Sequence, residues 1–416
     1  MTKATLERPD LERDEIAVKK PRRRLFAIAE FLLFLIVGLL LLEPALKLAG
    51  VGDEENYLLD DKVGWKPVPN RSATNRTEGY SRYKINSLGM RDIERSIAKP
   101  ANTFRIAVLG CSMTEGKQVS LEQNYCRVLE KELNKKAGAT KYEVLNFAVS
   151  AYTLGQEYLR LKDFALQFKP DLVVFTARPN ALLYMGPDLD KGFFNARPVF
   201  GVMPDGTLVE DHNFQRHWTA SAEGRRVKNF TWLSTYSSLY AVIGRCAYSL
   251  AEYKKNLITR IYLRFVPKQK RQQILASLWT PGVDVRDSGK AQSNALDYLG
   301  QVAAAIVRES KSECDKAHCR FVLAYLPTQS RYMNAKEQQI IHKFSESMKI
   351  DLVDLNPEFE HLQSVSTKPL YIEIHPSKFG HEMMATFLKT QLEKKGLLKS
   401  SQEASSDRTD LSSNLN

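Results

Sequence analysis

The stretch FRIAVLGCSMTEG, Phe104–Gly116, sets the frame in which the rest of the chain is interpreted. Residues 106–109 are apolar, the run ends at Gly110, and Ser112 follows. A buried strand that ends in a glycine-containing turn presents side chains at the carboxyl edge of a parallel sheet. Apolar positions at helical spacing predict a helix over 119–133. Because one short motif is weak evidence, an ordinary strand-to-helix turn with an incidental serine is the alternative.

The same alternation recurs downstream, which indicates βαβ units and a parallel sheet. Further strands are predicted over 142–147, 170–175, 320–326 and 351–355, and helices over 154–168, 290–312, 334–347 and from near His381. The pattern breaks from residue 193 onward, where 203–208 reads as a hairpin turn and 232–276 as a helical region with many tyrosines and cations. We interpret this part as an insertion or cap. We favour a solvated packing face for its helix over contact with a membrane surface.

Residues 25–42, LFAIAEFLLFLIVGLLLL, form an apolar run just long enough to cross a bilayer, which takes about 20 residues. KKPRRR precedes the run and the acidic residues 53–55 follow it, so the positive-inside rule places the N-terminus in the cytoplasm and the rest on the periplasmic side. A cleaved signal peptide is disfavoured by the long leader and by the lack of a small-x-small site. The adjacent cations argue against a buried helix of a soluble protein.

The chain has 416 residues and a net charge of +12, but its lysines and arginines are scattered. Because no basic stripe interleaved with aromatic residues is present, a nucleic-acid partner is not expected, and anionic lipid or an acidic polymer suits the charge better. Five cysteines make neither a disulfide scaffold nor a metal array. Cys314 and Cys319 flank a short turn and are open to either interpretation, a disulfide or free buried thiols. No cofactor and no metal is predicted.

Polar residues follow several of the predicted strands, and the carboxyl ends of parallel strands meet at one edge of a sheet. A serine needs a base to become a nucleophile, and His375 is the only histidine in such a loop. Glu373 is the nearest acid that would orient its imidazole. The backbone N–H groups of Ser112 and Ala151 and the side-chain amide of Asn180 are the predicted oxyanion donors.

The chain resembles the SGNH/GDSL hydrolases in four ordered blocks. These are GCSM at 110–113, NFAVSAY at 146–152, PDLVVFTARPN at 170–180 and EIHPSKFGH at 373–381. The phrase INSLGMRD at 85–92 is similar to membrane-anchored bacterial members. The resemblance implies a flavodoxin-like three-layer α/β/α sandwich with a parallel, roughly five-stranded sheet. It also implies that Ser112 is the nucleophile, His375 the base and Glu373 the orienting acid, with Ser112, Ala151 and Asn180 around the oxyanion.

Several positions depart from the family pattern. Cys111 replaces the usual Asp beside the serine, Ala151 replaces a glycine, and Ala181 stands where Asp is common. Only the N–H of Ala151 is expected to act, so its side chain is tolerable. Ile372 occupies the position three residues before the histidine, where the family often has Asp. Glu373 is therefore the acid on which the predicted triad depends.

The leading hypothesis is a single-pass membrane protein whose exported domain is a serine esterase acting on short O-acyl groups of an envelope glycan. The alternatives are an O-acetyltransferase that uses the same site with an envelope partner protein as acyl supplier, and a catalytically lapsed domain that binds glycan or scaffolds an envelope complex. The predicted organisation is a disordered basic leader (1–24), a transmembrane helix (25–47), an irregular arm (48–103), the first core part (104–192), the insertion (193–285), the second core part (286–398) and a disordered tail (399–416).

Overall fold

The structure is a computed structural model that describes residues 13–398 except 54–56, 136–137, 139, 183–184, 186–191, 248, 251–287 and 330–333. Its centre is a five-stranded sheet in which every pairing is parallel. The strands, in spatial order, are β11 (Asp351–Asp354), β10 (Arg320–Tyr325), β7 (Leu172–Ala177), β5 (Thr103–Leu109) and β6 (Lys141–Asn146). Numbered along the chain this order is 2-1-3-4-5, the flavodoxin-like arrangement, whose switch point lies beside the first strand. The predicted fold class is confirmed.

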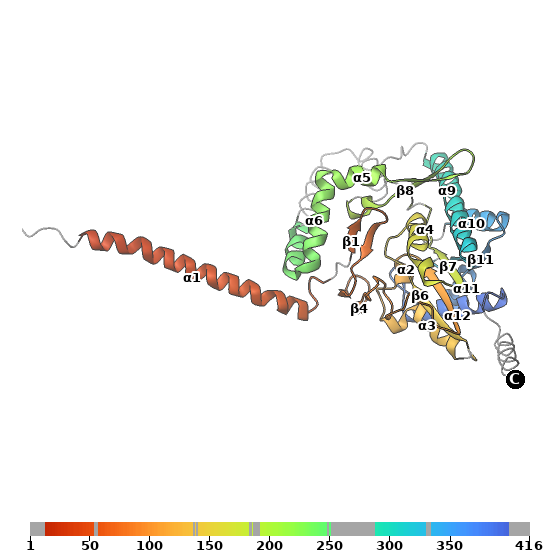
Figure 1. The fold of residues 1–416 in the computed structure, drawn as a ribbon, viewed down its shortest axis with the longest axis horizontal. Coiled ribbons are helices and arrows are strands. Elements are labelled where there is room, and N and C mark those ends of the chain that lie inside the picture. The colour runs from red at the N-terminus through yellow and green to blue at the C-terminus, as the bar shows by residue number, and fades with distance from the viewer. Residues whose placement is uncertain are drawn as a thin grey trace, which may run out of the picture.

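The three inner strands, β5, β7 and β10, are largely apolar because both faces of the sheet are covered. Every residue of β5 is buried; Ala107 and Leu109 face one hydrophobic cluster, and Ile106 and Val108 face the other. The first cluster is closed by α4 (Leu154–Asp163), α9 (Ser288–Lys316) and α10 (Ala335–Ser347). The second is closed by α3 (Tyr125–Asn134), α11 (Asn356–Val365) and α12 (Lys378–Lys394). These three layers make the α/β/α sandwich at the right of Figure 1.

The arm between the N-terminal helix and the core is not irregular, so that prediction is wrong. It forms two antiparallel hairpins, β1 (Tyr57–Asp60) with β2 (Gly64–Pro67) and β3 (Ser72–Asn75) with β4 (Ser81–Lys84). Trp65 is fully buried in the core cluster. The strands are only four residues long, too short for a clear alternating pattern in the sequence, and packing against the core stabilises them.

The insertion leaves the core after η4 (Gly192–Ala196). The hairpin predicted around 203–208 is confirmed by β8 (Val199–Val202) and β9 (Leu208–Asp211). Two helices follow, α5 (Asn213–Ala220) and α6 (Ala222–Tyr236), and residues 238–247 and 249–250 are also helical. Most of the helical region predicted up to residue 276 lies outside the described residues.

The N-terminal helix, α1 (Arg13–Leu48), projects from the globular part (Figure 1). Within it, Leu25–Leu48 has a mean hydropathy of 2.9 and is not buried by the rest of the chain, which fits a transmembrane or signal-anchor helix. Residues 13–24, predicted as disordered leader, are helical because their Lys, Arg and Glu residues are good helix formers and continue an existing helix. Residues 1–12 and the predicted tail, 399–416, lie outside the described residues. Cys314 and Cys319 are buried free thiols.

Candidate active site

Ser112 begins a one-turn helix, α2 (Ser112–Glu115), directly after β5. Gly110 makes the turn possible, because a Cβ at this position would lie 2.4 Å from Thr176 Oγ1 and 2.5 Å from Thr114 Oγ1. Gly116 ends the helix in the left-handed conformation, with φ of 66°. The GCSMTEG stretch therefore fixes the serine at the carboxyl edge of the sheet, beside the topological switch point.

His375 meets this serine from the other end of the chain. It lies in the short strand β13 (His375–Pro376), which pairs with β12 (Tyr371–Ile372) and leads into α12. Its Nε2 is 2.8 Å from Ser112 Oγ. This is hydrogen-bond distance between a hydroxyl and an imidazole that would accept its proton.

The other imidazole nitrogen contacts Glu78, and not the predicted Glu373. His375 Nδ1 lies 2.5 Å from Glu78 Oε2, and both side chains are largely shielded, with exposed fractions of 13% and 15%. Glu373 occupies the two-residue turn between β12 and β13, with φ of 52°, and is exposed. Within the described part of the chain its carboxylate makes no ion pair with His375, because the hairpin turn directs it to solvent. The structure thus corrects the position of the acid.

Glu78 comes from the loop between β3 and β4, in the segment that was predicted to be irregular. Asn75 Nδ2 donates to the carbonyl of Glu78 at 2.8 Å and holds the loop. Gly79 adopts φ of 71°, and a Cβ there would be 3.2 Å from Ile372 Cδ1, so the loop packs closely on the His375 hairpin. No spacing rule connects Glu78 to the serine or histidine blocks, and the sequence carried no signal for it.

The two predicted oxyanion loops have unusual backbone conformations. Ala151 and Asn180 both adopt positive φ, 62° and 61°, which is uncommon for residues with a Cβ. Neither the Ser112 N–H nor the Ala151 N–H donates to an acceptor among the residues that the structure describes. The Val149 N–H donates to the Gly110 carbonyl at 3.0 Å, so the Ala151 loop is joined to the turn that carries the serine.

Glu337 supports the Asn180 loop from α10. Its carboxylate accepts from the Ala181 N–H at 3.2 Å and lies 3.3 Å from Tyr325 Oη. Burial raises the pKa of Glu337 from 4.5 to about 7, and the backbone N–H groups of residues 180–182 limit the rise. No pattern in the sequence indicates this role for Glu337.

Glu115 fixes the Ala151 loop from the serine helix itself. Its carboxylate accepts from the Ser150 N–H at 2.7 Å and from Ser150 Oγ. Tyr57 Oη donates to the same carboxylate, at 2.8 and 2.6 Å to its two oxygens. Trp65 Nε1 donates to the Ser150 carbonyl at 3.1 Å. The β1–β2 hairpin therefore braces the loop, and Glu115 joins three segments.

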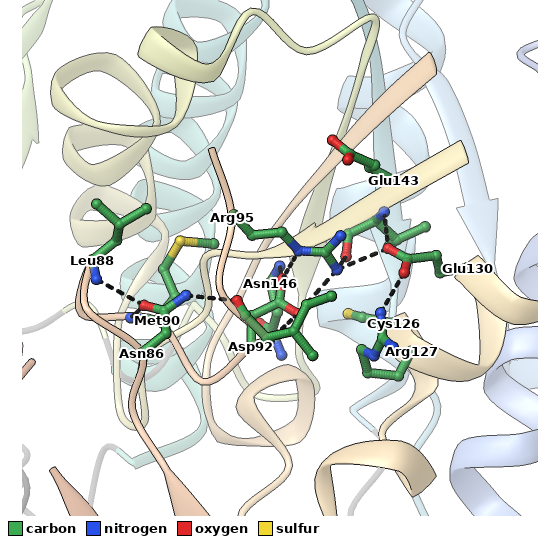
Figure 2. Close-up of polar contacts among 12 residues, drawn as sticks. Asn86, Leu88, Met90, Asp92, Arg95, Cys126, Arg127, Glu130, Glu143 and Asn146 are labelled. Atoms are coloured by element: carbon green, nitrogen blue, oxygen red, sulfur yellow. Dashed lines mark hydrogen bonds and ion pairs between the residues drawn. The ribbon is translucent and has the colours of Figure 1, made fainter. Parts of the chain in front are cut away.

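The phrase INSLGMRD connects the arm to the same region. Buried Arg91 donates to the carbonyl of Glu115 at 2.7 Å. Figure 2 shows Arg95 between the carboxylates of Asp92 and Glu130, at 3.0 and 2.8 Å. Asp92 also accepts from the Asn146 N–H at 3.2 Å. These buried ion pairs hold the arm against β6, the edge strand that leads into the Ala151 loop.

Two further buried titratable groups near the site, His381 and Cys111, are not poised for proton transfer. His381 stacks on Tyr125, and burial lowers its pKa to about 3, so its imidazole is neutral. Burial raises the pKa of the Cys111 thiol, which keeps it protonated beside the serine. Within the described residues no group of His, Cys, Asp and Glu side chains could hold a metal ion.

Comparison with known proteins gives distant structural likenesses only. No family model and no curated protein matches the sequence. Similar solved structures include a two-domain esterase (CEX) active on acetylated mannans, at 12% identity and a TM-score of 0.36, with 72% of this chain and 52% of that one covered. A G-D-S-L family protein from Desulfitobacterium hafniense DCB-2 is similar at 13% identity and a TM-score of 0.33, with 69% and 99% covered. A catalytic mutant of Axe2, an acetylxylan esterase from Geobacillus stearothermophilus, is similar at 12% identity and a TM-score of 0.36. The match covers 70% of this chain and 94% of that one.

The chain spans about half the length of the two-domain esterase that it resembles. Likenesses at this distance assign no activity to the chain, so the functional argument rests on the geometry at Ser112.

Proposed function

We propose that the chain is a membrane-anchored serine esterase of the SGNH/GDSL type. The observation that carries the proposal is the continuous chain of contacts from Ser112 Oγ to His375 Nε2 and from His375 Nδ1 to Glu78, at 2.8 and 2.5 Å. This order of nucleophile, imidazole and carboxylate is the one that activates a serine hydroxyl. In this proposal Glu78 takes the orienting role first given to Glu373.

Each group has a defined part in the reaction. The Glu78 carboxylate accepts the Nδ1–H of His375, which leaves Nε2 free to accept the Ser112 hydroxyl proton. Ser112 Oγ attacks the acyl carbon, and the alcohol leaves with the proton from Nε2. Water, activated by the same nitrogen, then releases the acid and restores the serine. The N–H groups of Ser112 and Ala151 and the Asn180 amide stabilise the oxyanion in both steps.

The proposed substrate is a short O-acyl ester on an envelope glycan, and the proposed location of the site is the periplasmic side. The location rests on α1 as a retained anchor with KKPRRR on its cytoplasmic flank. The substrate class rests on that location together with the family resemblance. Transfer of the acyl group to a second alcohol needs the same serine and histidine, so the products distinguish it from hydrolysis.

The test uses the full chain in detergent with p-nitrophenyl acetate and a fluorophosphonate probe. The expected result is labelling and turnover by the wild type, and a loss of turnover of roughly 10³-fold or more in Ser112→Ala and in His375→Ala. Acetate found in water supports hydrolysis, and acetate found on added glycan supports transfer.

His342→Ala is the matched control. His342 Nε2 lies 2.7 Å from Asp354, so it is also a histidine paired with a carboxylate, but it lies on α10 and no serine of the described residues is bonded to it. We expect this variant to keep wild-type turnover. An unlabelled wild type, or turnover that survives both Ser112→Ala and His375→Ala, contradicts the esterase proposal and favours the lapsed domain.

A further inference from the structure

The insertion exposes an apolar, aromatic face on two consecutive helical segments. On α6, Arg225, Asn229, Trp232 and Tyr236 are exposed at spacings of four, three and four residues, which places them on one side of the helix. The helical residues that follow, which pack on Phe230 of α6, expose Tyr240, Ile243 and Leu250 as well. Trp232 is 53% exposed and Leu250 63%. We call the residues Trp232, Tyr236, Tyr240, Ile243 and Leu250 the aromatic face.

The opposite side of α6 is packed against the protein. Thr231, Ser234 and Thr235 are buried there. The exposure of the aromatic face therefore does not come from a helix detached from the fold. Large apolar residues gathered on one face of a docked helix mark a contact with something else.

The aromatic face lies where α1 ends. Glu43, the residue directly after the apolar run, accepts from the Ser238 and Leu239 N–H groups at 2.8 and 3.0 Å and from Ser237 Oγ at 3.0 Å. Lys47 Nζ donates to the Tyr236 carbonyl at 3.2 Å. The connection between the two helical segments is thus hydrogen-bonded to the last turns of α1.

This connection fixes the depth of the aromatic face relative to a bilayer around α1. If α1 spans a bilayer, Glu43 and Lys47 mark the level at which the chain enters the headgroup region. Tyr236 and Tyr240 directly flank the bonded connection, and Trp232 is one turn away, about 6 Å along the helix. In Figure 1, α6 runs across the direction of α1, on the side of the globular part that α1 leaves. A helix in that position lies along the membrane surface.

The chemistry of the face suits that level. Trp and Tyr are enriched where a membrane meets water, because one end of each side chain is apolar and the other is polar. Arg225, Arg226 and Lys228 are exposed on the same helix and provide cations for anionic headgroups. We propose that the aromatic face lies in the interfacial layer of the bilayer that α1 spans and holds the esterase-like core against the membrane. The inference rests on the proposed role of α1 as a retained anchor.

The test measures tryptophan quenching in nanodiscs that hold one full-length chain each, made of phosphatidylcholine with phosphatidylglycerol, with or without phosphatidylcholine brominated near the top of its acyl chains. The emission of the wild type minus that of Trp232→Phe gives the contribution of Trp232, because both proteins contain the other tryptophans. We expect brominated lipid to reduce this contribution by at least half. Ile243→Trp and Leu250→Trp, each made in the Trp232→Phe background, should be quenched similarly.

Tyr298→Trp in the same background is the matched control, because Tyr298 is exposed on α9, on the other side of the molecule (Figure 1), and should not be quenched. Phe34→Trp, in the middle of α1, reports the anchor separately, in nanodiscs whose phosphatidylcholine is brominated near the ends of its acyl chains. If Phe34→Trp is quenched and Trp232 is not, a protein partner or solvent covers the face and the inference is overturned while the anchor stands. If Phe34→Trp is not quenched, the anchor fails and the inference fails with it. Equal quenching of Tyr298→Trp also overturns it.

Discussion

Glu78 is the residue whose role the structure changes most, and it gives the sharpest test of the site. Glu78→Gln keeps the size of the side chain but removes the negative charge beside His375 Nδ1, so the productive tautomer and the imidazolium lose their stabilisation. We expect kcat for p-nitrophenyl acetate to fall by roughly 10²- to 10⁴-fold with little change in KM. Steady-state kinetics of the full chain measure both constants.

Glu373→Gln is the paired control, since it makes the same chemical change at the exposed turn beside the histidine. Its kcat should stay within about twofold of the wild type. The reverse pattern, a large loss for Glu373→Gln and none for Glu78→Gln, would restore the acid that the sequence suggested and contradict the arrangement in the structure.

At single positions, the sequence predicted the residues that a local motif identifies and missed those that only a long-range contact places. Ser112 and His375 could be found because each lies in a recognisable block, Ser112 directly after a strand and His375 shortly before a helix. Glu78 could not, because it lies 297 positions from the histidine it contacts and in a hairpin too short to show a pattern. The same holds for Glu115, whose role depends on a contact with a loop 35 positions away. Residue type alone does not reveal such long-range partners.

Helix α10 affects the site by carrying Glu337 to the Asn180 loop, and this contact predicts a pH dependence of stability. Burial raises the pKa of Glu337 to about 7 in the folded protein, from 4.5 when it is exposed. In this pH range the folded state keeps the proton on the Glu337 carboxyl group, while the unfolded state releases it. The free energy of unfolding therefore falls as the pH rises from about 4.5 through 7. The loss is on the order of 3 kcal/mol at most.

Glu337→Gln removes this titration, so its free energy of unfolding relative to the wild type should increase between pH 4.5 and pH 8. Urea unfolding of the detergent-solubilised chain at several pH values measures the difference. Glu346→Gln, on the exposed side of α10, should track the wild type across the same range. A constant difference between Glu337→Gln and the wild type would show that Glu337 does not hold its proton in the folded state.

Among the elements, the sheet was predictable and the hairpins of the arm were not. The strands β5, β7 and β10 each contain an apolar run because helices cover both faces of the sheet, and such runs are visible in a sequence. The β1–β2 and β3–β4 hairpins exist through contacts with the core, such as those of buried Trp65 in β2 and of Ser81 in β4, whose hydroxyl donates to the Lys117 carbonyl. Their stability is tertiary in origin, so local propensity gave no sign of it.

Across the whole molecule, α1 and the Ser112–His375 pair are connected through the β3–β4 hairpin. Arg76 donates to the carbonyls of Gly50 and Ala49 at 2.7 and 2.9 Å, directly after the end of α1. A cation at this end of a helix also satisfies carbonyls that have no partner within the helix. Glu78 follows two residues later, so the end of α1 holds the loop that places the acid on His375.

Arg76→Ala should therefore weaken catalysis without touching the reacting groups. Freed from the end of α1, the loop holds Glu78 less firmly, and small displacements of a catalytic group cost up to about 10²-fold in rate. We expect kcat to fall while KM and labelling by the fluorophosphonate under saturating conditions are retained, and Arg76→Lys should recover part of the loss through one remaining hydrogen bond. Arg82 is an exposed arginine of the same hairpin, and Arg82→Ala is the control, which should leave kcat and KM unchanged. Equal effects of Arg76→Ala and Arg82→Ala would mean that the hairpin as a whole, and not its attachment to α1, sets the position of the acid.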